Sequence, residues 1–154
     1  PFNFDNIRFD KFCVTSSEVD LQGSHWAPHI TSKRVWDLVG GFSEEFNPGD
    51  GSDPDFCMKL WKEKVRIFKS INKFKVFHFG SMTTRKKKII KNNGTKIFIT
   101  KYGFNPKFFR KFYLRGGATS IYDGPLKKPK ISLAYLFELF FNKLKFLYYK
   151  ILIQ

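Results

Sequence analysis

Residues 36–61 read WDLVGGFSEEFNPGDGSDPDFCMKLW, and this stretch decides the fold that the sequence predicts. Apolar residues at helical spacing lead up to Gly40 and Gly41, which can end a helix, so we expect a helix over about 32–39. Residues 42–52 are rich in Gly, Pro, Asn and Asp and indicate a loop. The stretch therefore holds one helix, one loop and the start of a second helix.

The second helix is expected over about 53–64, with Ser52 or Asp53 as its N-cap. Apolar and polar residues then alternate over 65–68 and again over 74–79, and this alternation predicts two short strands. Helices and strands mixed along one chain are typical of the α/β class. The sequence therefore predicts an α/β fold.

The rest of the chain carries weaker signals. Residues 1–23 show no clear period and are expected to be extended or irregular, whereas helices are expected at about 93–102 and 106–115. A Gly-, Pro- and Lys-rich segment then resembles a linker. The predicted organisation is a domain over 1–115, a linker over 116–130 and an amphipathic basic helix within 131–154.

The C-terminal helix, expected over 131–152, combines an apolar stripe with lysines. The stripe consists of Leu133, Phe137, Phe140, Leu144, Leu147 and Ile151. Lys143, Lys145 and Lys150, together with many Phe and Tyr residues, favour a helix that lies on a membrane surface. Packing of the stripe on the domain or on a partner stays open as the alternative.

Charge is distributed unevenly along the 154 residues, whose net charge is +15. Residues 1–60 hold ten acids and five bases, a net of −5, and residues 61–154 hold three acids and 23 bases, a net of +20. Such a balance predicts an anionic partner. The two cysteines form no disulfide framework, which favours a reducing compartment, and no apolar run is long enough to predict a membrane span.

Three features could carry chemistry. Asp53 and Asp55, at the start of the second helix, could act as a general base or bind a divalent cation, or could simply cap the helix. His78, at the end of an expected strand, could bind a metal or phosphate, or could be structural. The basic run over 85–91 could bind nucleic acid or form a solvated surface. Local chemistry leaves these alternatives open.

The motifs also occur in a particular order, W-x-L-V-G-G-F-S-E-E-F-N-P-G, then S-D-P-D-F-x-M-K-L-W, V-R-I-F-K and V-F-H-F-G-S. In this order they resemble the C-terminal half of the catalytic domain of family 2 glycosyltransferases, closest to bacterial members that build lipopolysaccharide or other surface glycans. The resemblance covers about residues 22–115. It implies a GT-A fold and inverting transfer of a sugar from a nucleotide-sugar donor to a glycan or glycolipid acceptor.

The resemblance also implies roles for single residues. Asp53 matches the second member of the family's acidic pair, which supplies the catalytic base, while Ser52 stands where the first member is commonly Glu. His78 matches the family's histidine at the end of the following strand, which in many GT-A enzymes completes the site of a divalent cation, Mn or Mg.

The same comparison implies an acceptor side. Gly40 and Gly41 match the loop that borders the acceptor site, and Asp55 matches an acidic residue two positions after the base. We also assign Trp26 to the acceptor side. These four residues are therefore the predicted acceptor-binding set.

The family's D-x-D motif, which binds metal and nucleotide, precedes the G-G-F loop, and nothing before residue 40 matches it. The resemblance therefore implies a partial GT-A fold without the N-terminal nucleotide-binding half, and we expect a fragment that transfers no sugar alone. The expected location is the cytoplasm, with peripheral attachment to the inner face of the membrane. The alternative is a non-catalytic basic module over 85–154 that binds an anionic membrane or, less favourably, nucleic acid.

Overall fold

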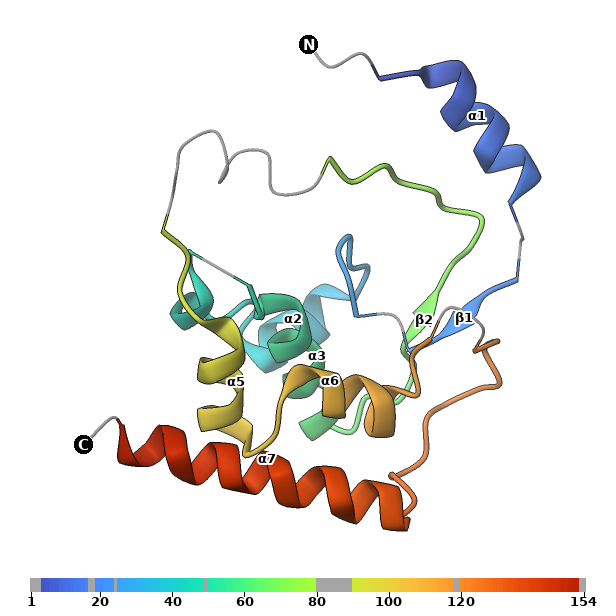
Figure 1. The fold of residues 1–154 in the computed structure, drawn as a ribbon. Helices are drawn as coiled ribbons and strands as arrows, with labels where there is room; N and C mark the ends of the chain where they lie inside the picture. The colour runs from blue at the N-terminus through green and yellow to red at the C-terminus, as the bar shows by residue number, and fades with distance from the viewer. Residues whose placement is uncertain are drawn as a thin grey trace.

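The computed structural model describes residues 4–16, 19–23, 25–48, 50–79, 90–117 and 120–152. In chain order, the elements are α1 (Asn6–Thr15), β1 (Leu21–Gln22), α2 (Lys33–Val39), the short turn of helix η1 (Glu44–Phe46), α3 (Ser52–Lys62), β2 (Lys69–Ser70), α5 (Gly94–Tyr102), α6 (Pro106–Phe108), the π-helical turn η2 (Phe109–Leu114) and α7 (Leu133–Ile151). Figure 1 shows α3, α5, α6 and α7 gathered in one group, with α1 extending away from it.

The fold is mixed, with helices predominating over one small sheet in the described residues. β1 pairs antiparallel with β2, with Leu21 opposite Ser70 and Gln22 opposite Lys69. The predicted mixture of helices and strands is confirmed in this broad sense. The same part of the chain contains no helix with the length and apolarity that a membrane span requires.

The predicted helices are present, and local capping explains their ends. The Ser32 side chain accepts a hydrogen bond from the Val35 amide at the start of α2, and Gly40 ends this helix with a left-handed φ of 68°. α6 begins with Asn105 as N-cap and Pro106 in its first turn. The sequence signals therefore located these helices correctly.

The two predicted strands, 65–68 and 74–79, are wrong, because neither segment is a strand in the structure. β1 pairs instead with Lys69–Ser70, which lie between them. Phe74 and Val76 are largely exposed, at 72% and 60%. An alternating pattern forms a stable strand only beside another strand, and the described residues offer these segments none.

The prediction of an irregular N-terminus is also wrong, because α1 is a helix of ten residues. The Asp5 side chain caps it by accepting a hydrogen bond from the Arg8 amide. Phe4 contacts Phe9 and Phe77 through ring pairs with centroids 5.5 Å and 4.7 Å apart. Segment 74–79 therefore packs aromatic rings against the beginning of the chain instead of joining a sheet.

The core is largely aromatic and lies between α3, α5, α6 and η2. Its buried members are Phe46, Phe56, Cys57, Met58, Leu60, Trp61, Phe68, Phe98, Phe104, Phe108, Phe109, Leu114 and Leu126. α3 contributes Phe56, Leu60 and Trp61 to this core. Large rings of this kind contribute most of the apolar area that stabilises a small core.

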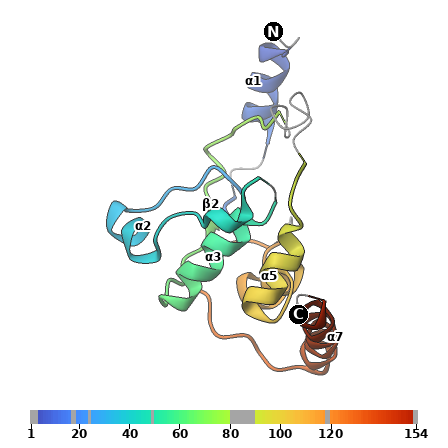
Figure 2. The same cartoon turned by 90° about the vertical axis from the view of Figure 1, so that its left-hand side faces the viewer.

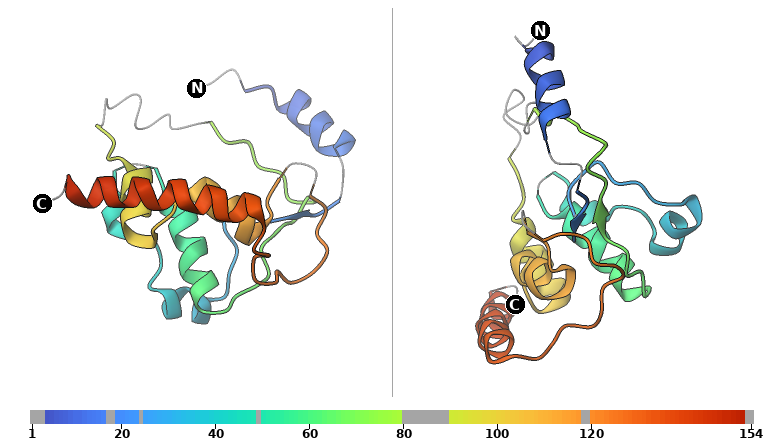
Figure 3. Two further views of the ribbon diagram at one scale, coloured as in Figure 1. Left: turned by 60° about the horizontal axis from the view of Figure 1, so that its bottom comes forward. Right: turned by 90° about the vertical axis from the view of Figure 1, so that its right-hand side faces the viewer.

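α7 packs against α5 at the outer edge of the helical group, and Figures 2 and 3 show it there from three further directions. The segment that precedes it also contacts the core, because Leu126 is buried and its amide donates to the Arg66 carbonyl. The predicted linker is therefore fixed to the domain at this point.

The loop before α3 approaches α5 so closely that one glycine is required. A Cβ on Gly94 would lie 1.4 Å from the carbonyl oxygen of Asp50, whereas a Cβ on Gly117 would meet only the Ser120 hydroxyl, at 3.3 Å. We expect Gly94→Ala to lower the free energy of unfolding by about 2–3 kcal/mol, because backbone must move. Urea denaturation measures this, with Gly117→Ala as control; equal stability of both variants would contradict the close approach.

Candidate functional site

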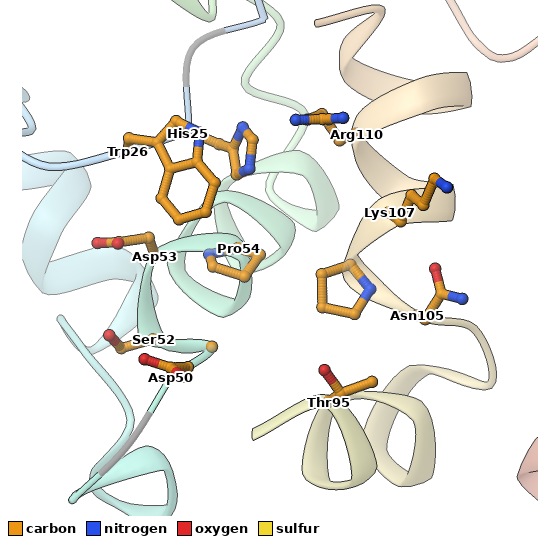
Figure 4. Close-up of a pocket in the computed structure, with 12 residues that line it drawn as sticks. His25, Trp26, Asp50, Ser52, Asp53, Pro54, Thr95, Asn105, Lys107 and Arg110 are labelled. Atoms are coloured by element: carbon orange, nitrogen blue, oxygen red, sulfur yellow. The ribbon is translucent and has the colours of Figure 1, made fainter. Parts of the chain in front are cut away.

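A pocket of about 740 Å³ opens between the start of α3 and the start of α6 (Figure 4). The residues that line it are His25, Trp26, Asp50, Gly51, Ser52, Asp53, Pro54, Thr95, Asn105, Pro106, Lys107 and Arg110. Figure 4 shows the aromatic and acidic side chains on one wall and the basic side chains on the other. A molecule bound in the pocket would therefore lie between an acidic, aromatic wall and a basic wall.

Asp53 lies in the first turn of α3, on the acidic wall. The N-cap is Gly51, with a φ of 111°, so the prediction that Ser52 or Asp53 caps this helix is wrong. The Asp53 carboxylate is free for another role, and its Oδ1 lies 3.4 Å from Nε2 of His29, close enough for an ion pair. In Figure 4 the carboxylate points away from the basic wall and out of the space between the two walls.

Burial of Asp53 raises the pKa of its carboxyl above the usual 3.8, although the charges of His29 and His78 oppose the rise. A carboxylate with a raised pKa binds a proton more strongly and is a better general base. Asp53 can therefore hold a proton at a higher pH than an ordinary aspartate.

Lys107 and Arg110 form the basic wall. They are three residues apart in one continuous helical segment, α6 followed by η2, while Phe108 and Phe109 between them are buried in the core. Both residues line the pocket, and in Figure 4 the Arg110 guanidinium extends toward the opposite wall whereas the Lys107 ammonium is turned away from it. Two cations on one wall, beside the first turn of a helix, suit a phosphate or carboxylate ligand.

Trp26 and His25 lie at the rim and the inner part of the first wall. Trp26 is 63% exposed and His25 is buried, with their ring centroids 4.6 Å apart. Burial, assisted by the charge of Arg110, lowers the pKa of His25 to about 4. His25 is therefore neutral near pH 7, and the exposed indole offers an apolar face next to polar groups.

Asp55 has no exposed surface and does not line the pocket. Its carboxylate accepts hydrogen bonds of 2.6 Å from the Ser43 and Tyr102 hydroxyls and lies 2.8 Å from the Lys101 ammonium. Burial alone raises the pKa of Asp55, but these bonds outweigh it and hold the pKa below the usual value. These contacts join the loop before α3 to α5. The predicted contact between Asp55 and an acceptor stays a prediction.

The remaining predicted residues lie apart from the pocket lining. Gly40 and Gly41 end α2, and the Gly41 carbonyl accepts a hydrogen bond from Lys59. His78 is exposed and is within electrostatic range of Asp53, whose pKa it lowers. Among the described residues, no group of three or more His, Cys, Asp or Glu side chains could hold a metal ion. Residues 85–89 of the basic run over 85–91 lie outside the described residues, and Lys91 forms an ion pair of 3.3 Å with Asp50.

The sequence did not identify four residues of this site: His25, His29, Lys107 and Arg110. Lys107 and Arg110 did carry a signal, because basic residues three apart flank two apolar ones on an expected helix. What the sequence could not supply is the loop geometry that brings them opposite Asp53.

The chain was also compared with known proteins. It matches no protein-family model, no curated protein and no solved structure. The functional conclusion therefore depends on the residues of the site and on the resemblance of the ordered motifs.

Proposed function

We propose that this chain forms the acceptor side of a glycosyltransferase of the GT-A type, in which Asp53 is the general base. The observation that carries the proposal is that Asp53, whose carboxyl has a raised pKa, and the basic residues Lys107 and Arg110 line opposite walls of one pocket. A sugar-transfer site needs these two elements, a base for the acceptor hydroxyl and positive charge for the departing diphosphate.

The proposed reaction is a single displacement at the anomeric carbon of a nucleotide-diphosphate sugar. The acceptor oxygen forms the new bond to this carbon as the bond to the diphosphate oxygen breaks. The acceptor proton passes to Asp53, and the negative charge remains on the diphosphate, next to Lys107 and Arg110. Because the base and the leaving group lie on opposite sides, the configuration at the anomeric carbon inverts.

The other walls fit the same reaction. Trp26, exposed at the rim, provides an apolar surface for the CH groups of a sugar ring, and Asp53 on the outer side would meet the acceptor hydroxyl there. The Mn or Mg ion that His78 would help to hold stays a prediction, because His78 lies apart from the pocket lining and the described residues contain no group of three or more metal-binding side chains. The described residues offer groups that could bind the acceptor and the diphosphate. No site is assigned to the nucleobase of the donor.

Binding of uridine diphosphate to the chain tests the basic wall. We expect Arg110→Gln to weaken binding at least about tenfold, because one charge-assisted hydrogen bond to phosphate is lost. Arg115→Gln is the matched control, since Arg115 pairs with Asp123 on the surface and does not line the pocket. Isothermal titration calorimetry at fixed salt measures both; equal affinities, or no binding by the unaltered chain, would contradict the assigned diphosphate site.

A further inference from the structure

The two sides of α7 differ in polarity, and the apolar side faces away from the domain. The side chains on its outward face are apolar and exposed, namely Leu133, Leu136, Phe137, Phe140, Phe141, Leu144, Leu147, Tyr148 and Ile151. They recur at spacings of three and four over the whole helix, so they form one continuous face. This face includes the complete stripe that the sequence predicts, and none of the stripe is used for packing on the domain.

The opposite face of α7 attaches the helix to the domain. Asn142 is buried, and its Oδ1 accepts a hydrogen bond of 2.8 Å from the Asn105 amide. Tyr135 and Leu139 pack against the core, and the Tyr135 and Phe108 ring centroids are 5.1 Å apart. α7 therefore presents its more polar face to the protein and its apolar face outward, as Figure 3 places it on the outside of the helical group.

Positive charge borders the apolar face. Lys150 lies along one margin, Lys143 lies along the same margin with its ammonium against Gly103 of the domain, and Lys145 lies along the other by helical spacing. Glu138 is the acid on α7, and it forms an ion pair with Lys111 of η2. The margins of the face are thus basic, and the acid of α7 is turned toward the domain and paired.

We infer that α7 seats this protein on an anionic lipid membrane, with its axis in the plane of the surface and its outward face in the acyl region. The charge pattern identifies the occupant: a broad apolar face with lysines at both margins matches a bilayer whose headgroups are negative. A second copy of the chain would bring the same lysine margins together and repel itself. This inference is independent of the proposed function.

Sedimentation of the chain with phospholipid vesicles tests the inference. We expect binding to vesicles of phosphatidylcholine and phosphatidylglycerol, mixed roughly two to one, and at least about tenfold weaker binding to phosphatidylcholine alone or at high salt. Leu144→Ser combined with Leu147→Ser should weaken binding at least about tenfold, because two apolar side chains no longer enter the acyl region.

The matched control combines Ile7→Ser with Val14→Ser, two similarly apolar and exposed positions on α1. This variant should bind as the unaltered chain does. A variant with Lys143, Lys145 and Lys150 all changed to Gln keeps the apolar face and should lose the preference for anionic vesicles. Circular dichroism confirms that each variant is folded.

Three results would overturn the inference. The first is recovery of the unaltered chain in the supernatant with either vesicle. The second is equal binding by the α7 and α1 variants. The third is a dimer in sedimentation equilibrium that the α7 changes dissociate while vesicle binding is absent, because a second copy would then cover the face. Uridine diphosphate binding should be the same in all of these variants, so failure here and failure of the proposed function are distinguishable.

Discussion

Sugar transfer is expected to fall about 10²- to 10⁴-fold when Asp53 is replaced by Asn, because the variant keeps the shape of the side chain and loses the proton acceptor. Binding of uridine diphosphate should change little, since Lys107 and Arg110 on the opposite wall are untouched. The measurement is transfer from a nucleotide sugar to a glycan or glycolipid acceptor by the protein in its complete natural form. Asp37→Asn, on the exposed surface of α2, is the control and should retain full activity.

The pH dependence gives a second measure of the same role. A general base acts only when deprotonated, so transfer should rise with pH through the pKa of Asp53. Because burial raises this pKa, the rise should occur at a higher pH than for an ordinary aspartate at 3.8. Turnover by Asp53→Asn with an unchanged pH profile would show that the base lies elsewhere.

Asp55→Ala should lower the free energy of unfolding by about 3 kcal/mol, the largest stability effect that we expect from any single carboxylate here. The substitution leaves the Lys101 ammonium and the Tyr102 hydroxyl without the acceptor that they now share. Asp123→Ala is the control, because Asp123 accepts two hydrogen bonds from Arg115 on the exposed surface. Exposed pairs contribute at most about 1 kcal/mol, so urea denaturation should separate the two variants clearly.

The sign of the pH effect follows from the direction of the pKa shift. The pKa of Asp55 is below 3.8 in the folded protein, so its contribution to the free energy of unfolding is complete above that value. The contribution is lost as the pH falls through the folded-state pKa. Unfolding experiments from neutral pH into the acid range should therefore show the difference between the unaltered chain and Asp55→Ala shrinking below about pH 4. A difference that stays constant with pH would mean that the carboxylate charge does not contribute.

Local signals predicted the helices well, because their causes are local. Ser32 and Asn105 cap the amides three residues ahead, and Gly40 adopts the left-handed conformation that ends a helix. The strand predictions failed because strand formation depends on a neighbour that can be distant in sequence: β2 is fixed by pairing with Leu21, 49 residues away. Alternation over 65–68 and 74–79 contained no information about that neighbour.

The candidate site, too, could be predicted from the sequence only in part. Asp53 was predicted as the base from its place in an ordered motif, and the structure puts it on a pocket wall with a raised pKa. Asp55, only two residues later, is directed into the core, because successive helical positions face different sides. No single-sequence pattern could show that Arg110, 57 positions after Asp53, lies across the pocket, since this depends on how α6 packs on the core.

Asn105 connects two parts of the molecule that were described separately. It lines the pocket and caps α6, and its amide is bonded to Asn142 of α7. A helix with its side chains is about 10–12 Å thick. When α7 lies on a bilayer, this bond holds the basic wall about one helix diameter from the outward apolar face of α7. An acceptor anchored in that bilayer must then extend its hydroxyl by a comparable length, so the Asn105–Asn142 bond would select acceptors by the reach of their head groups.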